Sequence, residues 1–263
     1  MSIEVKDLQV AYGDHAVIPC ASLNIPKGKV TMFIGKNGCG KSTLLKAIAR
    51  ILPVSKGQVF LEGQPMKQIS QKEIAKKIAI LPQSPIVPEG ISVQKLVSYG
   101  RFPYQKPFSG LCQQDYDIIT WAMKKTGVYE WKDQKVEALS GGQRQRVWIA
   151  LALAQKTDIL LLDEPTTYLD IAHQLEILEL LKQLNKEEKV TIVTVIHELN
   201  HAIKFGDHII GMKEGQILFE GSPKEVIHQE NLRHLYDIEA TLIQSEKGSY
   251  PICIDYTLLK ETK

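Results

Sequence analysis

The sequence lacks three features that would assign a class at once: paired cysteines, long apolar runs and a surplus of one charge. Its four cysteines form no C-x-x-C pair, so we expect neither a structural zinc site nor a disulfide framework, and a reducing cytoplasm fits. No apolar run approaches the ~18 residues that span a bilayer, and the first residues, MSIEVKDLQV, show no apolar core of a secretory signal. With 32 Lys and Arg against 30 Asp and Glu, the net charge of +2 gives no support for nucleic-acid binding.

What is present is an ordinary globular composition and an alternation of strands and helices. The 263 residues, 44% of them hydrophobic, suffice for one or two domains. Apolar patterning predicts strands at residues 3–10, 29–34, 58–62, 78–81, 159–162 and 190–196, and helices at residues 42–52, 92–99, 115–126, 143–154, 171–185 and 223–236. This order is typical of an α/β fold with a largely parallel sheet, interrupted by a mostly helical insertion over residues 88–154.

The strongest motif is a phosphate loop between a predicted strand and a predicted helix. The pattern G-x-x-x-x-G-K-[ST] is made by Gly35, Lys36, Asn37, Gly38, Cys39, Gly40, Lys41 and Ser42, and Thr43 follows. We expect Lys41 to reach the β- and γ-phosphates of a nucleotide, and the Ser42 hydroxyl to ligate Mg²⁺. The order of the glycines differs from the Rossmann pattern, which disfavours a nicotinamide cofactor. The alternative is a glycine-rich turn that binds nothing.

Two carboxylates follow the strand predicted at residues 159–162. Asp163 is suited to Mg²⁺, commonly through water, and Glu164 is suited to a base that orients the attacking water. Open α/β sheets bind ligands at the carboxyl ends of their strands, where we expect this pair. Alone, the pair is more typical of a solvated strand end; combined with the phosphate loop, it indicates nucleotide hydrolysis.

A second anion-binding helix start is predicted at Leu139, Ser140, Gly141, Gly142 and Gln143. The serine is expected to cap the helix, and the two glycines to let a phosphate approach its backbone amides. Because the phosphate loop already wraps one triphosphate, this second site fits nucleotide that is held by another copy of the chain. The alternative is a glycine-containing cap with no ligand.

Together these motifs resemble the ATP-binding cassette (ABC) family over about residues 1–222. The matching parts, in chain order, are Tyr12 for adenine stacking, Walker A at residues 35–43, Gln83 of the Q-loop, the signature at 139–143, Walker B at 159–164, the D-loop that ends at Asp170, and the switch histidine His197. Single residues keep a plain alternative, because Tyr12 also fits a surface turn and His197 also fits a helix cap.

The resemblance implies a P-loop NTPase core (RecA-like, with a mainly parallel sheet), an N-terminal antiparallel β region and an inserted helical subdomain. A single domain over residues 1–263 then divides into a core at 1–87 and 155–222, the helical subdomain at 88–154 and a C-terminal extension at 223–263.

The resemblance also implies a chemistry. Two chains form a head-to-tail dimer, which holds ATP between Walker A of one chain and residues 140–142 of the other. Mg²⁺ is bound by Ser42, Gln83 and Asp163. Hydrolysis depends on Lys41, Glu164 and His197, the last of which senses the γ-phosphate.

Finer resemblance indicates a role in transport. Residues 96–104, 138–146 and 163–171 look like the bacterial importers for ferric siderophores, haem and cobalamin, with a ferric siderophore or ferric citrate favoured. Such an ATPase is peripheral at the cytoplasmic face of the cell membrane, where it docks on permease subunits that receive cargo from an extracytoplasmic binding protein. The alternatives are haem, cobalamin or another cargo, or a non-transport ABC protein that uses ATP as a switch.

Three features fall outside the resemblance. Residues 197–201 match the zinc-protease pattern H-E-x-x-H, but His197 is expected at a strand end rather than within a helix, while spacing alone leaves Glu220 open as a third ligand. Lys36 stands where many ABC importers have proline. Residues 238–263 receive no task, since a β-like cap and a dimer contact are both open.

Overall fold

The computed structural model describes residues 2–13, 15–106, 109–245 and 250–259. The chain forms two compact units. The first unit contains residues 1–68 and 191–263, and the second contains residues 69–190. The phosphate loop and His197 belong to the first unit, whereas the two strand-end carboxylates and residues 139–143 belong to the second.

The first unit begins with an antiparallel sheet of strand order β2-β1-β4-β5. Its strands are β1 (Ile3–Tyr12), β2 (His15–Ile25), β4 (Lys56–Leu61) and β5 (Gln64–Pro65). In β1 the side chains of Ile3, Val5, Leu8 and Val10 are buried, and the register shifts between Val5 and Leu8 beside the positive φ of Asp7. This irregularity restores apolar side chains to the buried face after a break in the alternation. The N-terminal antiparallel region is therefore confirmed.

The same unit contains β3 (Val30–Ile34), β8 (Thr191–Val195), β9 (His208–Lys213) and β10 (Gln216–Gly221), in the order β10-β9-β3-β8. Strand β3 pairs in parallel with both β8 and β9, while β10 pairs antiparallel to β9. Every residue of β3 and β8 is buried, as expected of strands covered on both faces. The helices of this sheet are α1 (Lys41–Ile48) and α7 (Leu199–Phe205).

Helix α1 ends earlier than the predicted range of 42–52. Ala49 closes the helix, and Arg50 takes a left-handed conformation with φ of 59°. A residue in this conformation terminates a helix because its backbone turns away from the helical path.

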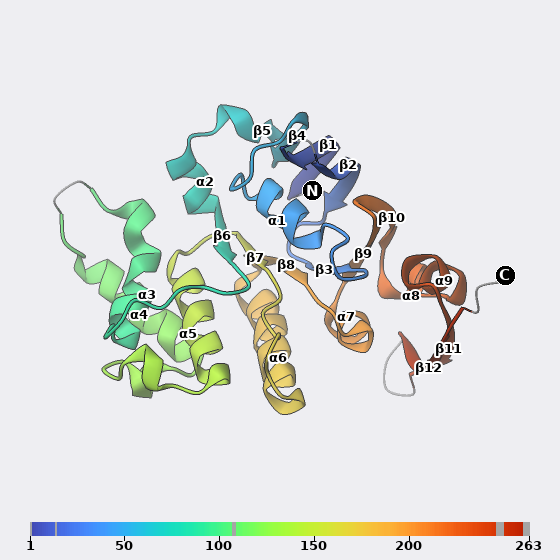
Figure 1. Ribbon diagram of the computed structural model, residues 1–263. Coiled ribbons are helices and arrows are strands. Elements are labelled where there is room, and N and C mark those ends of the chain that lie inside the picture. The colour runs from blue at the N-terminus through green and yellow to red at the C-terminus, as the bar shows by residue number, and fades with distance from the viewer. Residues whose placement is uncertain (1, 14, 107–108, 246–249, 260–263) are drawn as a thin grey trace. The chain divides into compact units, whose positions relative to one another are not determined.

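The second unit combines a parallel strand pair with a group of helices. Strands β6 (Ile78–Leu81) and β7 (Ile159–Leu162) pair in parallel. The helices are α2 (Gln71–Lys77), α3 (Val93–Ser98), α4 (Gln113–Lys125), α5 (Gly141–Ala154) and α6 (Ile171–Glu188). Figure 1 shows α3, α4 and α5 side by side, in agreement with their mutual contacts. Short 3₁₀ segments of this unit lie at Tyr99–Tyr104, Tyr129–Trp131 and Val136–Ala138, and one of the first unit lies at Met66–Gln68.

A buried ion pair holds this helical group together. The Arg101 Nε donates to Asp115 Oδ1 at 2.8 Å, and its Nη1 donates to the Ala154 carbonyl at the same distance. Both charged residues are buried, so the two contacts connect a 3₁₀ segment, α4 and the end of α5. With the parallel strand pairs of both units, these helices confirm the predicted α/β class.

The C-terminal segment contains two helices and a hairpin in place of the single helix predicted at 223–236. Helices α8 (Pro223–Val226) and α9 (Gln229–Tyr236) are separated because Ile227 and His228 leave helical geometry. His228 then caps α9 by accepting from the Asn231 amide. Strands β11 (Ile238–Gln244) and β12 (Pro251–Leu258) pair antiparallel, which confirms the β-like end.

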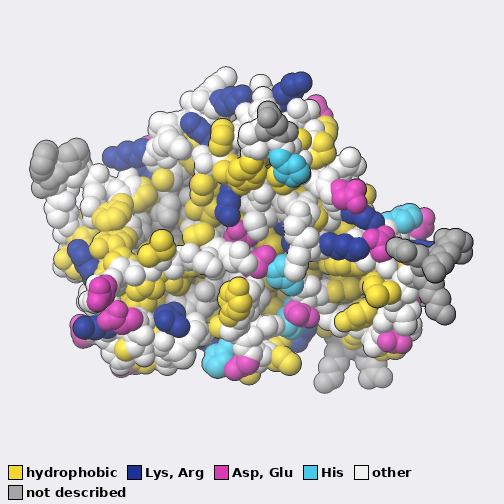
Figure 2. All heavy atoms as spheres, in the orientation of Figure 1, with side chains coloured by type: hydrophobic (Ala, Val, Ile, Leu, Met, Phe, Trp, Pro, Cys, Tyr) yellow, Lys and Arg dark blue, Asp and Glu magenta, His cyan; other side chains and the backbone are white. Residues whose placement is uncertain are grey.

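Charge is mixed on the surface that is in view. Figure 2 shows Lys and Arg interspersed with Asp and Glu, in keeping with the nearly balanced composition. Among the described residues, no helix combines the length and the apolar character needed to cross a membrane.

Candidate functional site

The phosphate loop joins β3 to α1 in the first unit. Gly40 precedes α1 with φ of 101° and the helix start receives no side-chain cap. A β-carbon on Gly40 would lie 2.7 Å from Ile18 Cδ1, and one on Gly35 would collide with the Met212 carbonyl oxygen. Glycine is therefore required at both ends of the loop, and the uncapped helix start offers its positive dipole end to an anion.

Lys41 is 4% exposed and lies across the loop. Its Nζ donates to the carbonyls of Gly35 and Lys36, at 2.8 Å in each case. A buried ammonium held by neutral carbonyls can exchange them for phosphate oxygens, because charge-assisted contacts are stronger than neutral ones. Ser42 and Thr43 are half-buried in the first turn of α1.

Tyr12 and His197 both lie at exposed positions of the first unit. Tyr12 ends β1 and is 52% exposed, so its ring is available for stacking. His197 is exposed between β8 and α7, as the sequence predicts. Asn37 and Gly38 of the loop are likewise exposed, whereas Cys39 is buried.

The zinc-protease pattern does not adopt the geometry that it requires. His197 precedes α7, whereas His201 lies within it and burial lowers its pKa. Glu220 instead accepts from the Asn24 backbone amide at 3.0 Å. Within the described ranges, no group of three His, Cys, Asp or Glu residues is placed to hold a metal ion.

In the second unit, Glu164 is at the centre of a small polar cluster. Its Oε2 accepts from Thr167 Oγ1 at 3.0 Å and from Gln83 Nε2. Asp163, directly before it, is buried and its amide donates to the Leu81 carbonyl at 2.9 Å. The structure thus brings the Q-loop glutamine and the second strand-end carboxylate together.

The backbone around Glu164 is unusual. Glu164 has φ of 53° and Tyr168 has φ of 65°, both in the left-handed region that non-glycine residues rarely occupy. Tyr168 is also 92% exposed, so burial does not hold it there. Strain of this kind persists where surrounding contacts fix it and is concentrated at functional sites.

Residues 139–143 form a capped helix start, as predicted. Ser140 Oγ accepts from the Gln143 amide at 3.3 Å, and Gln143 Oε1 accepts from the Ser140 amide at 2.9 Å. Leu139 is buried, whereas Ser140 and Gly141 are exposed. The reciprocal cap satisfies two backbone donors at the start of α5.

Asp170 caps α6 and holds His173 beside the signature helix. Its Oδ1 accepts from the His173 amide at 2.9 Å and lies 2.8 Å from His173 Nδ1, and these contacts lower the pKa of Asp170. A β-carbon on Gly142 would lie 2.6 Å from the His173 ring, so the start of α5 rests against the start of α6.

Sequence reasoning missed Thr167 and His173. Thr167 lies three residues after Glu164, and His173 lies three residues after the helix cap Asp170. The second spacing was a usable signal, because an aspartate N-cap accepts from the backbone amide three residues further on.

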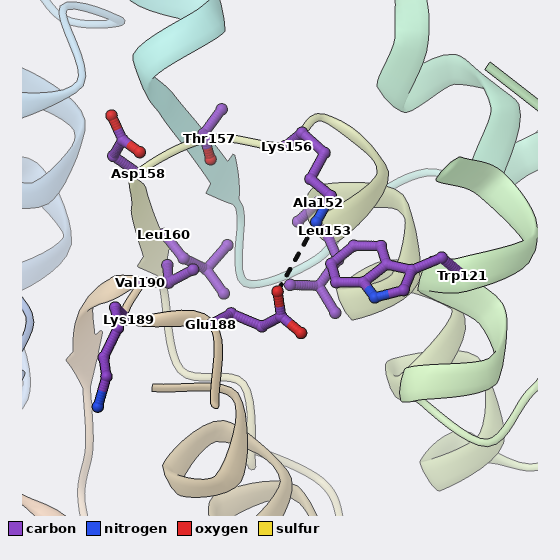
Figure 3. Close-up of a pocket in the computed structure, with 10 residues that line it drawn as sticks. All are labelled: Trp121, Ala152, Leu153, Lys156, Thr157, Asp158, Leu160, Glu188, Lys189 and Val190. Carbon is purple, nitrogen blue, oxygen red and sulfur yellow. Dashed lines mark ion pairs between the residues drawn. The ribbon is translucent and has the colours of Figure 1, made fainter. Parts of the chain in front are cut away.

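A separate pocket in the second unit contains none of the predicted site residues. It is lined by residues of α4, α5 and β7, by the loop before β7, and by the end of α6 with the two residues that follow it. Figure 3 shows Lys156 between Trp121 and Glu188. The Lys156 Nζ lies 3.4 Å from the centroid of the Trp121 ring and 3.7 Å from Glu188 Oε2. Lys156 is thus held at the pocket wall by a cation–π contact and an ionic contact.

Comparison with known proteins identifies the class. The model of the ABC transporter family matches residues 20–167, and the chain belongs to this family. It is therefore an ABC-type ATPase that binds nucleotide, and its close relatives are ATP-binding subunits of importers.

Two relatives illustrate the likeness. The iron(3+)-hydroxamate import ATP-binding protein FhuC of Bacillus subtilis (strain 168) is 50% identical over 262 residues, which cover 100% of this chain and 97% of that protein. The ferric enterobactin transport ATP-binding protein FepC of Escherichia coli (strain K12) is 42% identical, over 95% of this chain and 92% of that protein.

Solved structures confirm the predicted P-loop core. A metal-chelate type ABC transporter in an inward-facing conformation is similar with a TM-score of 0.83 and 25% identity, over 99% of this chain and 98% of that one. The ATP-binding cassette MJ0796, solved as a dimer in a post-hydrolysis state with ADP and Pi, has a TM-score of 0.73 and 30% identity, over 84% and 98% of the two chains.

Proposed function

We propose that this chain energises the import of a ferric siderophore by hydrolysing ATP on behalf of a separate membrane permease. The observation that carries the proposal is the whole-length similarity to the iron(3+)-hydroxamate import subunit. A third relative, 45% identical over 97% of this chain, is the petrobactin import ATP-binding protein FpuD of Bacillus anthracis. The proposed location is the cytoplasmic face of the cell membrane, with an extracytoplasmic binding protein delivering the cargo to the permease.

The proposed ATP site is shared between two copies of the chain. In each site, one chain supplies the phosphate loop with Lys41, while Tyr12 stacks on adenine. The other chain supplies residues 139–143 and Asp170. The dimeric state of the cassette MJ0796 supports this arrangement. The proposal includes a core at 1–87 and 155–222, a helical subdomain at 88–154 and an extension at 223–263.

The donor set fits Mg²⁺. Ser42, Gln83 and Asp163 offer hydroxyl, amide and carboxylate oxygens, which are the ligands that this hard cation takes in phosphate sites. Mg²⁺ would balance phosphate charge there.

Glu164 is proposed to orient the attacking water and accept its proton. Its Oε2 already accepts from Gln83 and Thr167, so the carboxylate is aimed before nucleotide arrives. His197 is proposed to hold the γ-phosphate from the junction after β8. Lys41 would contribute its positive charge.

Glu164→Gln tests the catalytic part. The variant keeps the shape and loses the charge, so we expect ATP binding to persist, turnover to fall by a factor of about 10² or more and a nucleotide-bound dimer to accumulate. Glu179→Gln, on the exposed face of α6, is the matched control and should hydrolyse ATP normally. Parental ATPase activity in Glu164→Gln would contradict the role given to Glu164.

Uptake measurements test the cargo. Cells that lack this chain would be supplied with radiolabelled ferric hydroxamate, ferric catecholate or haem, and complemented with the wild-type chain or with Glu164→Gln. We expect the wild type alone to restore uptake of a ferric siderophore. Restoration of haem uptake without siderophore uptake would overturn the cargo and leave the ATPase standing.

A further inference from the structure

The phosphate loop is tied to the C-terminal segment by the lysine that departs from the family pattern. Lys36 Nζ lies 2.6 Å from Asp237 Oδ2. The other carboxylate oxygen of Asp237 accepts from Lys213 Nζ at 2.8 Å. Lys213 is the last residue of β9 and also donates to the His234 carbonyl at 2.8 Å. One carboxylate therefore joins the loop, the end of β9 and the last turn of α9.

The loop is also in contact with the end of β9 and with the turn after it. Gly35 packs against the Met212 carbonyl so closely that a β-carbon would not fit, and the Gly215 amide donates to the Cys39 carbonyl at 2.9 Å. Neither of these two contacts involves Lys36, which is exposed. The ion pair with Asp237 therefore adds a contact at a residue of the loop that the other two leave out.

Tyr236 brings the same segment close to the loop. Burial raises the pKa of its phenol, and the backbone of Gly35 acts in the opposite direction. Among the described residues, no partner lies within hydrogen-bonding geometry of the Tyr236 hydroxyl. Tyr236 is therefore near Gly35 but does not form a hydrogen bond with it. Tyr236 and Asp237 thus face the first two residues of the loop.

Aspartate is an unfavourable residue type at the position of Asp237, the C-terminal end of α9. It closes α9 in a left-handed conformation with φ of 58°, where glycine or asparagine is preferred. A carboxylate at the C-terminus of a helix also opposes the helix dipole. The Lys213 and Lys36 ammonium groups lower the pKa of its carboxyl to about 2, so the charge is present at every physiological pH. Aspartate is thus unfavourable at this helix end, yet it lies where two lysine ammonium groups meet. This combination points to a role outside the helix.

We propose that Asp237 is a positioning residue for nucleotide binding, which acts through Lys36 to hold the first turn of the phosphate loop. A loop that is already held has less freedom to lose when ATP binds, and this raises affinity. The inference rests on the proposed function, since it takes the loop to be the ATP site. Asp237 directly precedes residues 238–263, to which the sequence assigns no task.

The expected effect is small, because Lys36 and Asp237 are each 47% exposed at their side chains. Exposed ion pairs contribute little, and a loss of this size corresponds to about a threefold weaker affinity. The contact is also screened by salt, so the difference from the wild type should shrink as ionic strength rises.

Asp237→Asn in the full chain separates the proposed role from stability. Asparagine suits a left-handed helix end, so the unfolding midpoint should stay equal or rise, while the Kd for a fluorescent ATP analogue should rise about threefold. Lys36→Met should show the same loss, and the double variant should show no further loss because both act through one contact. Glu239→Gln is the control, since it removes a neighbouring carboxylate that pairs with Arg233 on α9.

The outcomes decide between explanations. Wild-type or tighter ATP binding by Asp237→Asn overturns the inference, and so do losses that add in the double variant. A loss of affinity that follows a loss of stability, or that Glu239→Gln shares, would make the contact merely structural and also overturn it. A wild-type chain that binds no ATP would overturn the proposed function as well, so the two failures are distinguishable.

Discussion

Replacing Gly142 with alanine should destabilise the protein, whereas the same change at Gly141 should not. A β-carbon on Gly142 would lie 2.6 Å from His173 Cδ2 and 3.1 Å from its Cγ. The ring cannot move aside freely, because Asp170 holds its Nδ1 at 2.8 Å. A β-carbon on Gly141 would meet only Leu169 Cδ2, at an ordinary 3.6 Å.

The magnitude follows from two opposing effects. Alanine in place of glycine in the middle of a helix gains about 0.5–1 kcal/mol, and Gly141→Ala, at the first residue of α5, should receive part of it. Gly142→Ala receives the same gain but forces the ring to shift, which costs about 1–3 kcal/mol. The two variants should therefore differ by about 2 kcal/mol, or about 4–8 °C in the unfolding midpoint of a chain of this size.

Thermal unfolding of both variants, in the wild type and in a His173→Ala background, is the assay. Removing the ring removes the obstacle, so Gly142→Ala should become neutral or stabilising in that background. Equal midpoints for Gly141→Ala and Gly142→Ala would refute the reasoning. So would a penalty at Gly142 that persists without the His173 ring.

Two further predictions concern buried charges. Lys41→Ala should weaken nucleotide binding by a factor of about 10 or more, because it removes a charge-assisted contact to phosphate, and unchanged affinity in a nucleotide titration would contradict its role. Asp115→Asn should cost about 3 kcal/mol at neutral pH, since it leaves the buried Arg101 unpaired. Burial alone would raise the pKa of Asp115, but the Arg101 guanidinium and the Cys112 amide hold it lower. The contribution of the ionised Asp115 to the free energy of unfolding is therefore full above the ordinary pKa of aspartate, and it is lost as pH falls through the lower folded value. In urea unfolding, the difference in stability between the wild type and Asp115→Asn should therefore disappear in acid.

The parts of the fold that were predictable are those with unbroken apolar patterns. Strands β6 and β7 match their predicted ranges to the residue, because each is a short apolar run bounded by a polar or turn residue. Strand β2 received no prediction of its own, since it contains Pro19 and alternates burial irregularly. Strand β10 received no prediction either, and its residues alternate between exposed and half-buried. The break between α8 and α9 depends on the backbone at Ile227, which apolar spacing does not report.

The predictable part of the site is the part written in contiguous motifs. The capping pair of Ser140 and Gln143 follows from a spacing of three residues, and the structure shows it. The contact of Gly142 with His173, and that of Lys36 with Asp237, join residues that are far apart along the chain. Such pairs follow only from the folded path of the backbone, and a single sequence does not encode them as a pattern.

Two short turns in the first unit have consequences for engineering the protein. The turn at Glu62 and Gly63 has positive φ at both residues, and a β-carbon on its glycine would meet open space. The turn at Glu214 and Gly215 has the same backbone form, but its glycine packs on Val17 and Pro19. Hairpin tips usually accept an inserted epitope or a new chain terminus. Here an inserted tag belongs at the first turn, whereas at the second turn it would displace β2, which also packs on Gly40 of the phosphate loop.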